Sequence, residues 1–457
     1  MESLRKVIAL RSAKIINIIL VSGIFACFCF FCFVPNLIIE FASMERLAIA
    51  ALFLILYVLF ARVYDAFLIS QCRISEAIFS QILAAILADL ISYFMIGLLM
   101  RGIPSVIIML LIPLLQSLVI VAWCYFAHQW YFKLFPPKRS AIIYGDRYDF
   151  DALIHEYGLE KKFQIEKTVP IESFLSDPWW LDGMEALFLA GIPSHERNQV
   201  LKHCVYAGVQ AYVLPNIGDV IMSGAARTHM FHLPILRVGR CTPTPEYLFM
   251  KRFFDVACSA VALLLLMPLM LLIAVAVKLC DGGKVFYRQQ RLTKNGRLFW
   301  LVKFRSMKPD AEANGIPRLS SGAQDHRVTA VGRILRRFRL DELPQLWNIL
   351  KGDMSIVGPR PERPELAEEI EQTLPEFQLR LQVKAGLTGY AQVYGKYNST
   401  PYDKLKMDLM YIANPSFFED IRICFATIKV LFEVESTDGV RDEADNTTDK
   451  REEMVVR

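Results

Sequence analysis

Four apolar segments fill the first third of the chain. They cover residues 15–39, 47–61, 77–100 and 102–132, and charged residues are nearly absent from them. Because a bilayer core of about 30 Å requires roughly 20 helical residues, the pattern predicts four transmembrane helices. Lysine and arginine gather before the first segment, between the second and third, and after the fourth. Since positively charged loops face the cytoplasm, we expect the N-terminus and everything after residue 133 to lie there.

The next part of the chain, residues 136–245, alternates short apolar runs with helical stretches. Alternation of this kind is typical of an α/β domain with a parallel sheet. The first turn, at 144–148, lacks the second and third glycines of a dinucleotide-binding fingerprint. We therefore expect a Rossmann-like scaffold that holds no dinucleotide. The predicted strands are RSAIIYG, FQIEKTV, EALFLAG and VQAYVLP.

A further apolar run at 253–279 contains a proline near its middle. Its uncharged part, 256–277, is long enough for a fifth transmembrane helix. Pro268, however, removes a backbone hydrogen bond and kinks or breaks a helix. Basic residues also flank the run on both sides, which leaves no preferred direction of insertion. We therefore favour a re-entrant helix, which enters and leaves by one face, over a complete fifth span.

The region after this run predicts an α-rich unit. A strand is expected at 299–304, and helices are expected at 328–339 and 341–350. The stretches 402–413 and 420–434 mix charged with apolar residues, which suits interfacial helices and core-packing helices equally.

Bulk composition supports a membrane protein. Hydrophobic residues make up 54% of the chain and the mean hydropathy is +0.34, both high for a soluble protein. A net charge of +5, without a zinc-finger or RNA-binding motif, argues against a nucleic-acid partner. The cysteines form no recognisable disulfide framework, which fits a reducing compartment.

One acidic pair lies next to a dense group of arginines. Asp341 and Glu342 follow five arginines within residues 327–339. Guanidinium groups match phosphate oxygens, although a surface that faces lipid headgroups explains them equally well. One acid could attack phosphorus while the other holds a cation or moves a proton. The alternative is an acidic helix N-terminus in which Arg337 pairs with Asp341.

Four motifs occur in a characteristic order: KR at 251–252, KFRSM at 303–307, DELPQLWNILKGDMSIVGPRPE at 341–362 and GLTGYAQV at 386–393. Together they closely resemble the bacterial sugar transferases known as polyisoprenyl-phosphate hexose-1-phosphate transferases, within the monotopic phosphoglycosyl transferase superfamily. The four apolar segments and the α/β domain resemble its large undecaprenyl-phosphate glucose or galactose phosphotransferase branch. Two departures are small: Ala385 replaces the usual proline, and YGK at 394–396 replaces the usual NGR.

The resemblance implies a two-step transfer through a covalent intermediate. Asp341 attacks the β-phosphate of a UDP-sugar and UMP leaves. Undecaprenyl phosphate then takes the sugar-phosphate from Asp341, in the first step of exopolysaccharide, capsule or O-antigen repeat-unit synthesis. Glu342 assists, and Mg²⁺ binds at Asp341 with the diphosphate. The other implied residues are Lys303, Arg305, Arg336 and Arg360 for phosphate or substrate, Pro359, Pro361 and Gln392 for the nucleotide loop, and Pro268 for the re-entrant break.

The expected protein is thus a mixed membrane protein of the bacterial inner membrane. Its α/β and catalytic domains lie on the cytoplasmic face, where UDP-sugars occur. A non-catalytic membrane scaffold and a tethered oxidoreductase or dehydratase are less favoured. The sugar (glucose, galactose or an acetamido sugar), the polymer, and a regulatory or homodimer-forming role of the α/β domain stay open. The expected divisions are four transmembrane helices at 1–135, the Rossmann-like domain at 136–245, the α-rich catalytic domain at 246–435 and a disordered charged tail at 436–457.

Overall fold

The computed structural model describes most of the chain, in two compact units. The described residues are 2–31, 42–69, 74–100, 105–145, 154, 159–177, 181, 183–230, 232–308, 327–395 and 400–432. The units are Met1–Leu214 and Pro215–Arg457. The predicted tail at 436–457 and residues 146–147 of the predicted turn lie outside the described residues. The division into four parts stays a prediction.

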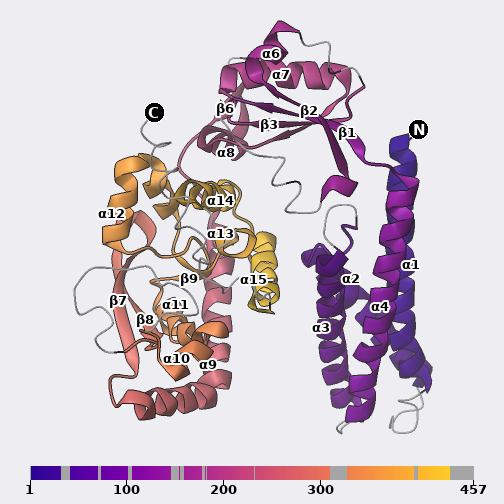
Figure 1. Ribbon diagram of the computed structural model, residues 1–457. Coiled ribbons are helices and arrows are strands. Elements are labelled where there is room, and N and C mark those ends of the chain that lie inside the picture. Colours follow the sequence, from indigo (N-terminus) through magenta and orange to yellow (C-terminus); the bar gives the residue numbers. More distant parts are fainter. Residues whose placement is uncertain are drawn as a thin grey trace. The chain divides into compact units, whose positions relative to one another are not determined.

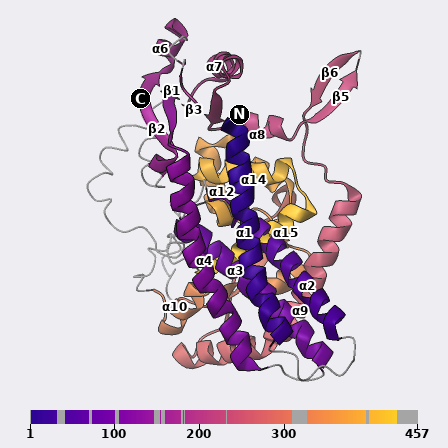
Figure 2. The same ribbon diagram turned by 90° about the vertical axis from the view of Figure 1, so that its right-hand side faces the viewer.

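Four long helices form a bundle in the first unit (Figure 2). Each predicted apolar segment lies largely within one of them, and neighbouring helices contact one another around the bundle. Tyr57 and Phe53 are fully buried in the interior, whereas leucines and isoleucines cover the outside. Among the described helices, these four and one helix of the second unit are long and apolar enough to cross a membrane. The four are α1 (Glu2–Phe31), α2 (Ala42–Val63), α3 (Ile74–Met100) and α4 (Val106–Leu134).

A four-stranded parallel sheet completes the first unit (Figure 1). Its strand order is β2-β1-β3-β4, and all five residues of β3 are buried. Phe174 of α6 (Ile171–Ser176) and Val200 of α7 (Ser194–Ala207) pack against the apolar side chains of the sheet. The predicted parallel sheet is therefore confirmed. The strands are β1 (Lys138–Tyr144), β2 (Phe163–Pro170), β3 (Ala186–Ala190) and β4 (Gln210–Val213).

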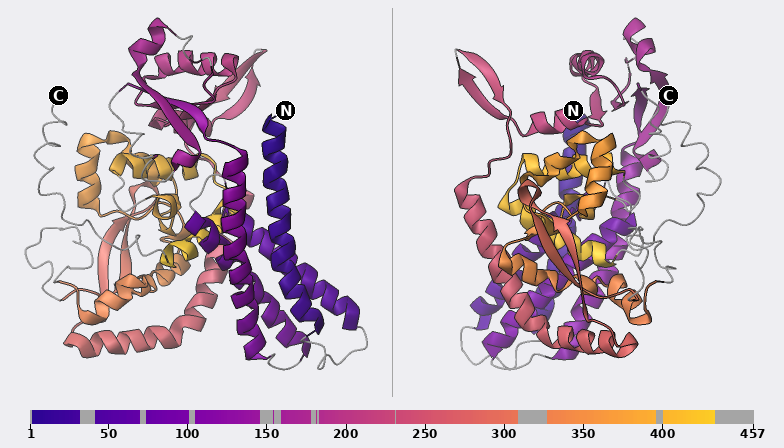
Figure 3. Two further views of the ribbon diagram at one scale, coloured as in Figure 1. Left: turned by 45° about the vertical axis from the view of Figure 1, so that its right-hand side comes forward. Right: turned by 90° about the vertical axis from the view of Figure 1, so that its left-hand side faces the viewer.

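The second unit combines short helices with three two-stranded sheets. In the described chain its elements are α8 (Ile217–Ser223), β5 (Ala226–Met230), β6 (Leu233–Arg237), α9 (Pro245–Asp281), β7 (Phe286–Leu292), η4 (Lys294–Gly296), β8 (Leu298–Phe304), α10 (Ala330–Arg337), η6 (Leu340–Glu342), α11 (Gln345–Lys351), β9 (Ser355–Val357), α12 (Pro364–Thr373), η7 (Pro375–Gln382), β10 (Gly386–Thr388), α13 (Tyr390–Tyr394), α14 (Pro401–Ala413) and α15 (Phe417–Phe432). The hairpin of β5 and β6 projects as a separate ribbon (Figure 3).

Helix α9 is long and bent. It contains Pro268 in its interior, and its ribbon changes direction sharply between an upper and a lower part (Figures 1 and 3). A proline inside a helix lacks the amide hydrogen and displaces the preceding turn, which accounts for such a bend. Apolar side chains beside the proline, such as Leu265 and Leu271, are strongly exposed. The helix therefore presents an oily surface on both sides of the bend.

The first part of α9 is fixed to the rest of the unit by charged side chains. Arg252 donates to the carbonyls of Ile349 and Leu350, near the end of α11, at 2.7 Å each. Asp255 accepts from the backbone of Ile356 at 2.9 Å. The basic flanks were expected to leave the apolar run without a preferred direction of insertion, and one of them, Arg252, makes this internal contact. Lys251 likewise pairs with Asp420 of α15 at 2.9 Å.

Two predicted helices differ in detail from the structure. The helix expected at 341–350 is interrupted: η6 ends at Glu342 and α11 begins at Gln345. The stretch 402–413 forms α14, in which Leu405 and Leu409 pack into the main core of the unit. Core packing therefore accounts for the apolar positions of this helix, and its interfacial position stays a prediction.

Candidate active site

The acidic pair lies on a tight turn that is held from one side by leucines. Leu340 and Leu343 flank the pair and pack with Phe304 of β8 in a small apolar cluster. Arg339, just before the turn, adopts a left-handed backbone conformation with φ 52°. A non-glycine residue pays about 1–2 kcal/mol for this conformation, which the surrounding packing must supply.

This turn excludes one interpretation of the pair. Helix α10 ends at Arg337, and the left-handed Arg339 separates it from Asp341. The two positions therefore do not share a helix, and the i,i+4 pairing of Arg337 with Asp341 is wrong. Instead, Arg337 lies over the ring of Phe338, with 5.8 Å between the guanidinium carbon and the ring centroid.

Glu342 is held between two cations from distant parts of the chain. Its Oε1 lies 3.1 Å from Nζ of Lys303 on β8 and 3.5 Å from Nη2 of Arg360. Burial raises the pKa of Glu342, but the positive charges of Lys303 and Arg360 outweigh burial and hold this pKa at about 2. The carboxylate is therefore ionised at neutral pH and fully engaged.

Asp341 has a different environment, although it is the neighbouring residue. Its side chain is only 9% exposed, and it forms no ion pair with any residue that the structure describes. Burial raises the pKa of Asp341, Lys303 acts in the opposite direction, and the negative charge of Glu342 adds to the rise. Asp341 is thus a partly desolvated carboxylate beside Glu342, whose charge is balanced by two cations. Of the two acids, Asp341 is the one free to react with a ligand.

Of the predicted phosphate-binding residues, the structure brings Lys303, Arg336 and Arg360 to the acidic pair. Arg336 interacts electrostatically with Asp341, and its Nε donates to Ser306 Oγ at 2.9 Å. Arg305 is directed elsewhere, because it forms an ion pair with Asp281 at the end of α9.

The loop that carries Arg360 starts from a close contact between two short strands. The Gly358 amide donates to Thr388, and the Gly386 amide donates to the Pro359 carbonyl, both at 2.9 Å. A Cβ on Gly358 or Gly386 would collide with the opposite backbone, so both motifs require glycine here. Pro359 and Pro361 therefore belong to a rigid loop whose tip, Arg360, reaches Glu342.

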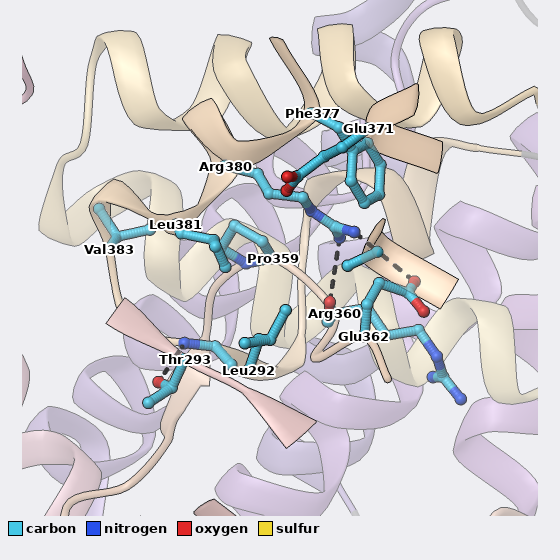
Figure 4. Close-up of a pocket in the computed structure, with 12 residues that line it drawn as sticks. Leu292, Thr293, Pro359, Arg360, Glu362, Glu371, Phe377, Arg380, Leu381 and Val383 are labelled. Carbon is cyan, nitrogen blue, oxygen red and sulfur yellow. Dashed lines mark hydrogen bonds and ion pairs between the residues drawn. The ribbon is translucent and has the colours of Figure 1, made fainter. Parts of the chain in front are cut away.

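Two arginines that the sequence analysis did not identify as site residues, the buried Arg380 and the half-buried Arg291, support this loop from behind. Arg380 donates to the Arg360 carbonyl at 3.0 Å and lies 3.6 Å from Glu362, as Figure 4 shows. Arg291 donates to the Pro361 carbonyl at 3.2 Å. Arg380 is itself neutralised by Asp408 of α14, at 2.8 Å. The sequence did contain one indication of this ion pair: Asp408 is a charged residue at a core position of α14.

Gln392 lies on α13 and contacts the neighbouring strand rather than the acidic pair. Its amide donates to the Leu387 carbonyl at 3.1 Å, and in the described chain no hydrogen bond links it to Asp341 or Glu342. A role for Gln392 toward a nucleotide therefore stays a prediction.

The donor set around the pair suits a cation that is shared with a ligand. Among the described residues, no three histidines, cysteines or acids gather into a metal cage. Mg²⁺ often takes only one or two carboxylates and completes its shell with substrate phosphates and water. Asp341, which no cation neutralises directly, fits this arrangement, whereas Glu342 is already committed to Lys303 and Arg360.

Comparison with known proteins places this site in a family. The profile described as bacterial sugar transferase matches residues 246–434, which include the acidic pair and its supporting loop. An exopolysaccharide production protein of Rhizobium meliloti, ExoY, is 41% identical over 191 residues, covering 39% of this chain and 83% of the relative. The chain belongs to the bacterial sugar transferase family.

Longer members of the bacterial sugar transferase family match over part of their length. A UDP-N-acetylgalactosamine-undecaprenyl-phosphate N-acetylgalactosaminephosphotransferase of Aeromonas hydrophila is 37% identical over 239 residues, or 52% of this chain and 55% of the relative. A UDP-glucose:undecaprenyl-phosphate glucose-1-phosphate transferase of Xanthomonas campestris is 36% identical over 251 residues, or 52% of each protein. The matched region thus spans about half of each of these two relatives.

The buried arginine behind the loop provides a test of how the site is supported. In Arg380→Met, Asp408 loses its partner while still buried, which we expect to destabilise the second unit by about 3–5 kcal/mol. Adding Asp408→Asn to this variant removes the uncompensated charge and should restore part of the loss. Thermal unfolding of the detergent-purified variants measures both effects. A double variant no more stable than Arg380→Met alone would contradict the pairing.

Proposed function

We propose that this sugar transferase moves a sugar-1-phosphate from a UDP-sugar to undecaprenyl phosphate through a phosphosugar bound covalently to Asp341. The observation that carries the proposal is the contrast between adjacent acids. Glu342 is neutralised by Lys303 and Arg360, whereas Asp341 has no ion pair in the described chain. A carboxylate that is partly desolvated and lacks a direct counter-charge is a suitable nucleophile toward phosphorus.

In the first step, a carboxylate oxygen of Asp341 attacks the β-phosphorus of the donor. The bond from that phosphorus to the bridging oxygen breaks, and UMP leaves with this oxygen. Lys303, Arg336 and Arg360 supply fixed positive charge beside the developing negative charge on the phosphoryl oxygens. The ion pairs of Glu342 hold two of these cations in place before substrate binds.

In the second step, a phosphate oxygen of undecaprenyl phosphate attacks the same phosphorus. The acyl-phosphate bond breaks, Asp341 regains its carboxylate, and the product is a lipid-linked diphosphate sugar. The overall reaction consumes one UDP-sugar and one undecaprenyl phosphate and releases one UMP. Such a product would start a polysaccharide repeat unit.

Mg²⁺ is the proposed cofactor, held by Asp341 together with the diphosphate of the donor. When bound, it neutralises phosphate charge and so reduces the repulsion between an anionic nucleophile and an anionic substrate. The protein supplies the remaining charge through Lys303 and the arginines. Glu342 orients these cations, and its low pKa leaves it ionised throughout the neutral range.

The proposed placement is the cytoplasmic face of the bacterial inner membrane. The bend of α9 at Pro268 and the exposed leucines beside it support a helix that enters and leaves by the same face. A complete fifth span would carry the acidic pair to the opposite side from the N-terminus, away from cytoplasmic UDP-sugars. The four spans, the Rossmann-like character of the sheet domain and a homodimer stay predictions.

The sugar is open to direct measurement. The names of the Aeromonas and Xanthomonas relatives specify N-acetylgalactosamine and glucose respectively. Because proteins of similar identity to this chain differ in their sugar, a donor panel must contain acetamido sugars as well as glucose and galactose.

UMP release tests the proposed function. Purified protein with Mg²⁺ and undecaprenyl phosphate should release UMP from one member of a UDP-sugar panel, and Asp341→Asn should reduce the rate by at least about 10³-fold. Asp353→Asn is a matched control, because Asp353 pairs with Arg297 at 2.9 Å and does not contact the acidic pair. Folded wild-type protein that is inactive with every donor, or an active Asp341→Asn variant, would contradict the proposal.

The pH dependence of the rate tests the electrostatics. Asp341 must be ionised to attack, so kcat/KM should fall as the pH falls through its raised pKa. Lys303 lowers this pKa, so Lys303→Met should move the acid limb upward, whereas Lys303→Arg should leave it nearly in place. An acid limb that Lys303→Met leaves unchanged or moves downward would contradict this assignment.

A further inference from the structure

The interior of the α1–α4 bundle contains an acid and an amide side by side. Asp89 of α3 is 9% exposed and Gln116 of α4 is fully buried. Nε2 of Gln116 lies 3.5 Å from Asp89 Oδ1 and 3.5 Å from the Val21 carbonyl of α1. Two acceptors around this nitrogen fix which end of the amide faces them. The contact therefore places the carboxyl group against the amide and joins three helices.

The other two oxygens of this pair have no partner. In the part of the chain that the structure describes, neither Asp89 Oδ2 nor Gln116 Oε1 accepts a hydrogen bond, although both atoms are buried. If Asp89 were ionised, both atoms would be acceptors and could not bond to each other. Buried polar atoms without partners are energetically unfavourable, and more so when they are charged.

In the described bundle, the amide of Gln116 is the one group that donates a hydrogen bond to Asp89. No lysine or arginine of the described bundle pairs with it. Polar groups facing the interior from the other helices bond among themselves. Asn17 of α1 donates to Gln81 at 2.9 Å and accepts from Tyr57 of α2 at 2.7 Å. Of the titratable groups there, Tyr57 and Cys124 of α4 are both buried, and neither forms a hydrogen bond with Asp89 among the described residues.

The nearby buried hydroxyl groups do not donate hydrogen bonds to Asp89 either. Ser22 of α1 and Ser92 of α3 are buried, and their Oγ atoms make no hydrogen bond among the described residues, so neither donates to the carboxyl group of Asp89. An ionised carboxylate inside a membrane bundle would therefore have one long amide contact and no cation, which is a costly state.

We propose that Asp89 carries a proton on Oδ2. This hydroxyl group donates a hydrogen bond to Gln116 Oε1. Nε2 of Gln116 donates to Oδ1 in return, so the acid and the amide form a closed, doubly hydrogen-bonded pair. One proton then satisfies both unpartnered oxygens and removes the charge. The pair clamps α3 to α4, and the contact with Val21 adds α1.

The inference rests on the membrane placement of the bundle and is independent of sugar transfer. It predicts that acid–amide pairing contributes to the assembly of the bundle and is lost when Asp89 gives up its proton at alkaline pH. The site binds a proton rather than a metal ion. One carboxylate and one amide provide too few ligands for a metal cation.

Infrared spectroscopy of the full-length protein in lipid nanodiscs tests the proposal. At neutral pH we expect a carbonyl band of a protonated carboxyl group that shifts in D₂O and is lost in Asp89→Asn. Asp341→Asn is the matched control and should leave this band in place. The spectrum should be the same in sodium and potassium buffers. Absence of the band in the wild type, persistence in Asp89→Asn, or loss on adding sodium would overturn the proposal.

Thermal unfolding provides a second readout. Asn can donate its amide hydrogen to Gln116, so Asp89→Asn should unfold within about 2–4 °C of the wild type at neutral pH. The wild type should lose thermal stability at alkaline pH, whereas Asp89→Asn should not. Asp89→Leu, which cannot form the pair, should unfold at a lower temperature than Asp89→Asn. Equal alkaline sensitivity in wild type and Asp89→Asn would contradict the proton site.

Discussion

The carboxylate of Glu342 joins parts of the second unit that are distant in sequence. It lies within ion-pair distance of Lys303 on β8 and of Arg360 on the loop after β9, while its own turn follows α10. The position of each cation therefore depends on this one acid. Removing it would leave two positive groups without a partner and would release the loop tip. Asp341 has no ion pair among the described residues, whereas the neighbouring acid pairs with Lys303 and Arg360.

A second layer of buried charge keeps this arrangement rigid. Arg380 and Arg291 bind backbone carbonyls of the loop, and Asp408 neutralises Arg380 from the core helix α14. Burying charged side chains carries a desolvation penalty. In return, their ion pairs and hydrogen bonds can hold a loop in one geometry. The first part of α9 is fixed in a similar way through Arg252 and Asp255. The loop that carries Arg360 and the first part of α9 are thus each fixed within the second unit by polar contacts.

Much of this organisation could be predicted from local sequence. Apolar run length predicted the four helices of the bundle, and the alternation of short strands with helices predicted the parallel sheet. The motif around Asp341 and Glu342 identified the family and most of the residues near the pair. These predictions were correct because they depend on hydrophobic periodicity and short motifs, which involve only residues close together in sequence.

The failures concern contacts between distant residues. Helices were predicted at 328–339 and 341–350, but α10 ends at Arg337, Arg339 is left-handed, and the second helix is interrupted after Glu342. Arg252 was interpreted as a membrane flank, because its partners on α11 are about a hundred residues away along the chain. Arg305 was grouped with Lys303 by proximity in sequence, yet it pairs with Asp281. Arg380 and Asp408 carry no motif, and only the fold brings them together.

The central claim is that Asp341 carries the sugar-phosphate between the two steps. The most direct test is to incubate the protein with Mg²⁺ and the preferred UDP-sugar without undecaprenyl phosphate, and then to identify the modified peptide by mass spectrometry. The account predicts a phosphosugar adduct on Asp341 that disappears when undecaprenyl phosphate is added. If an enzyme active with both substrates formed no adduct, or carried it on another residue, Asp341 would not be the covalent nucleophile.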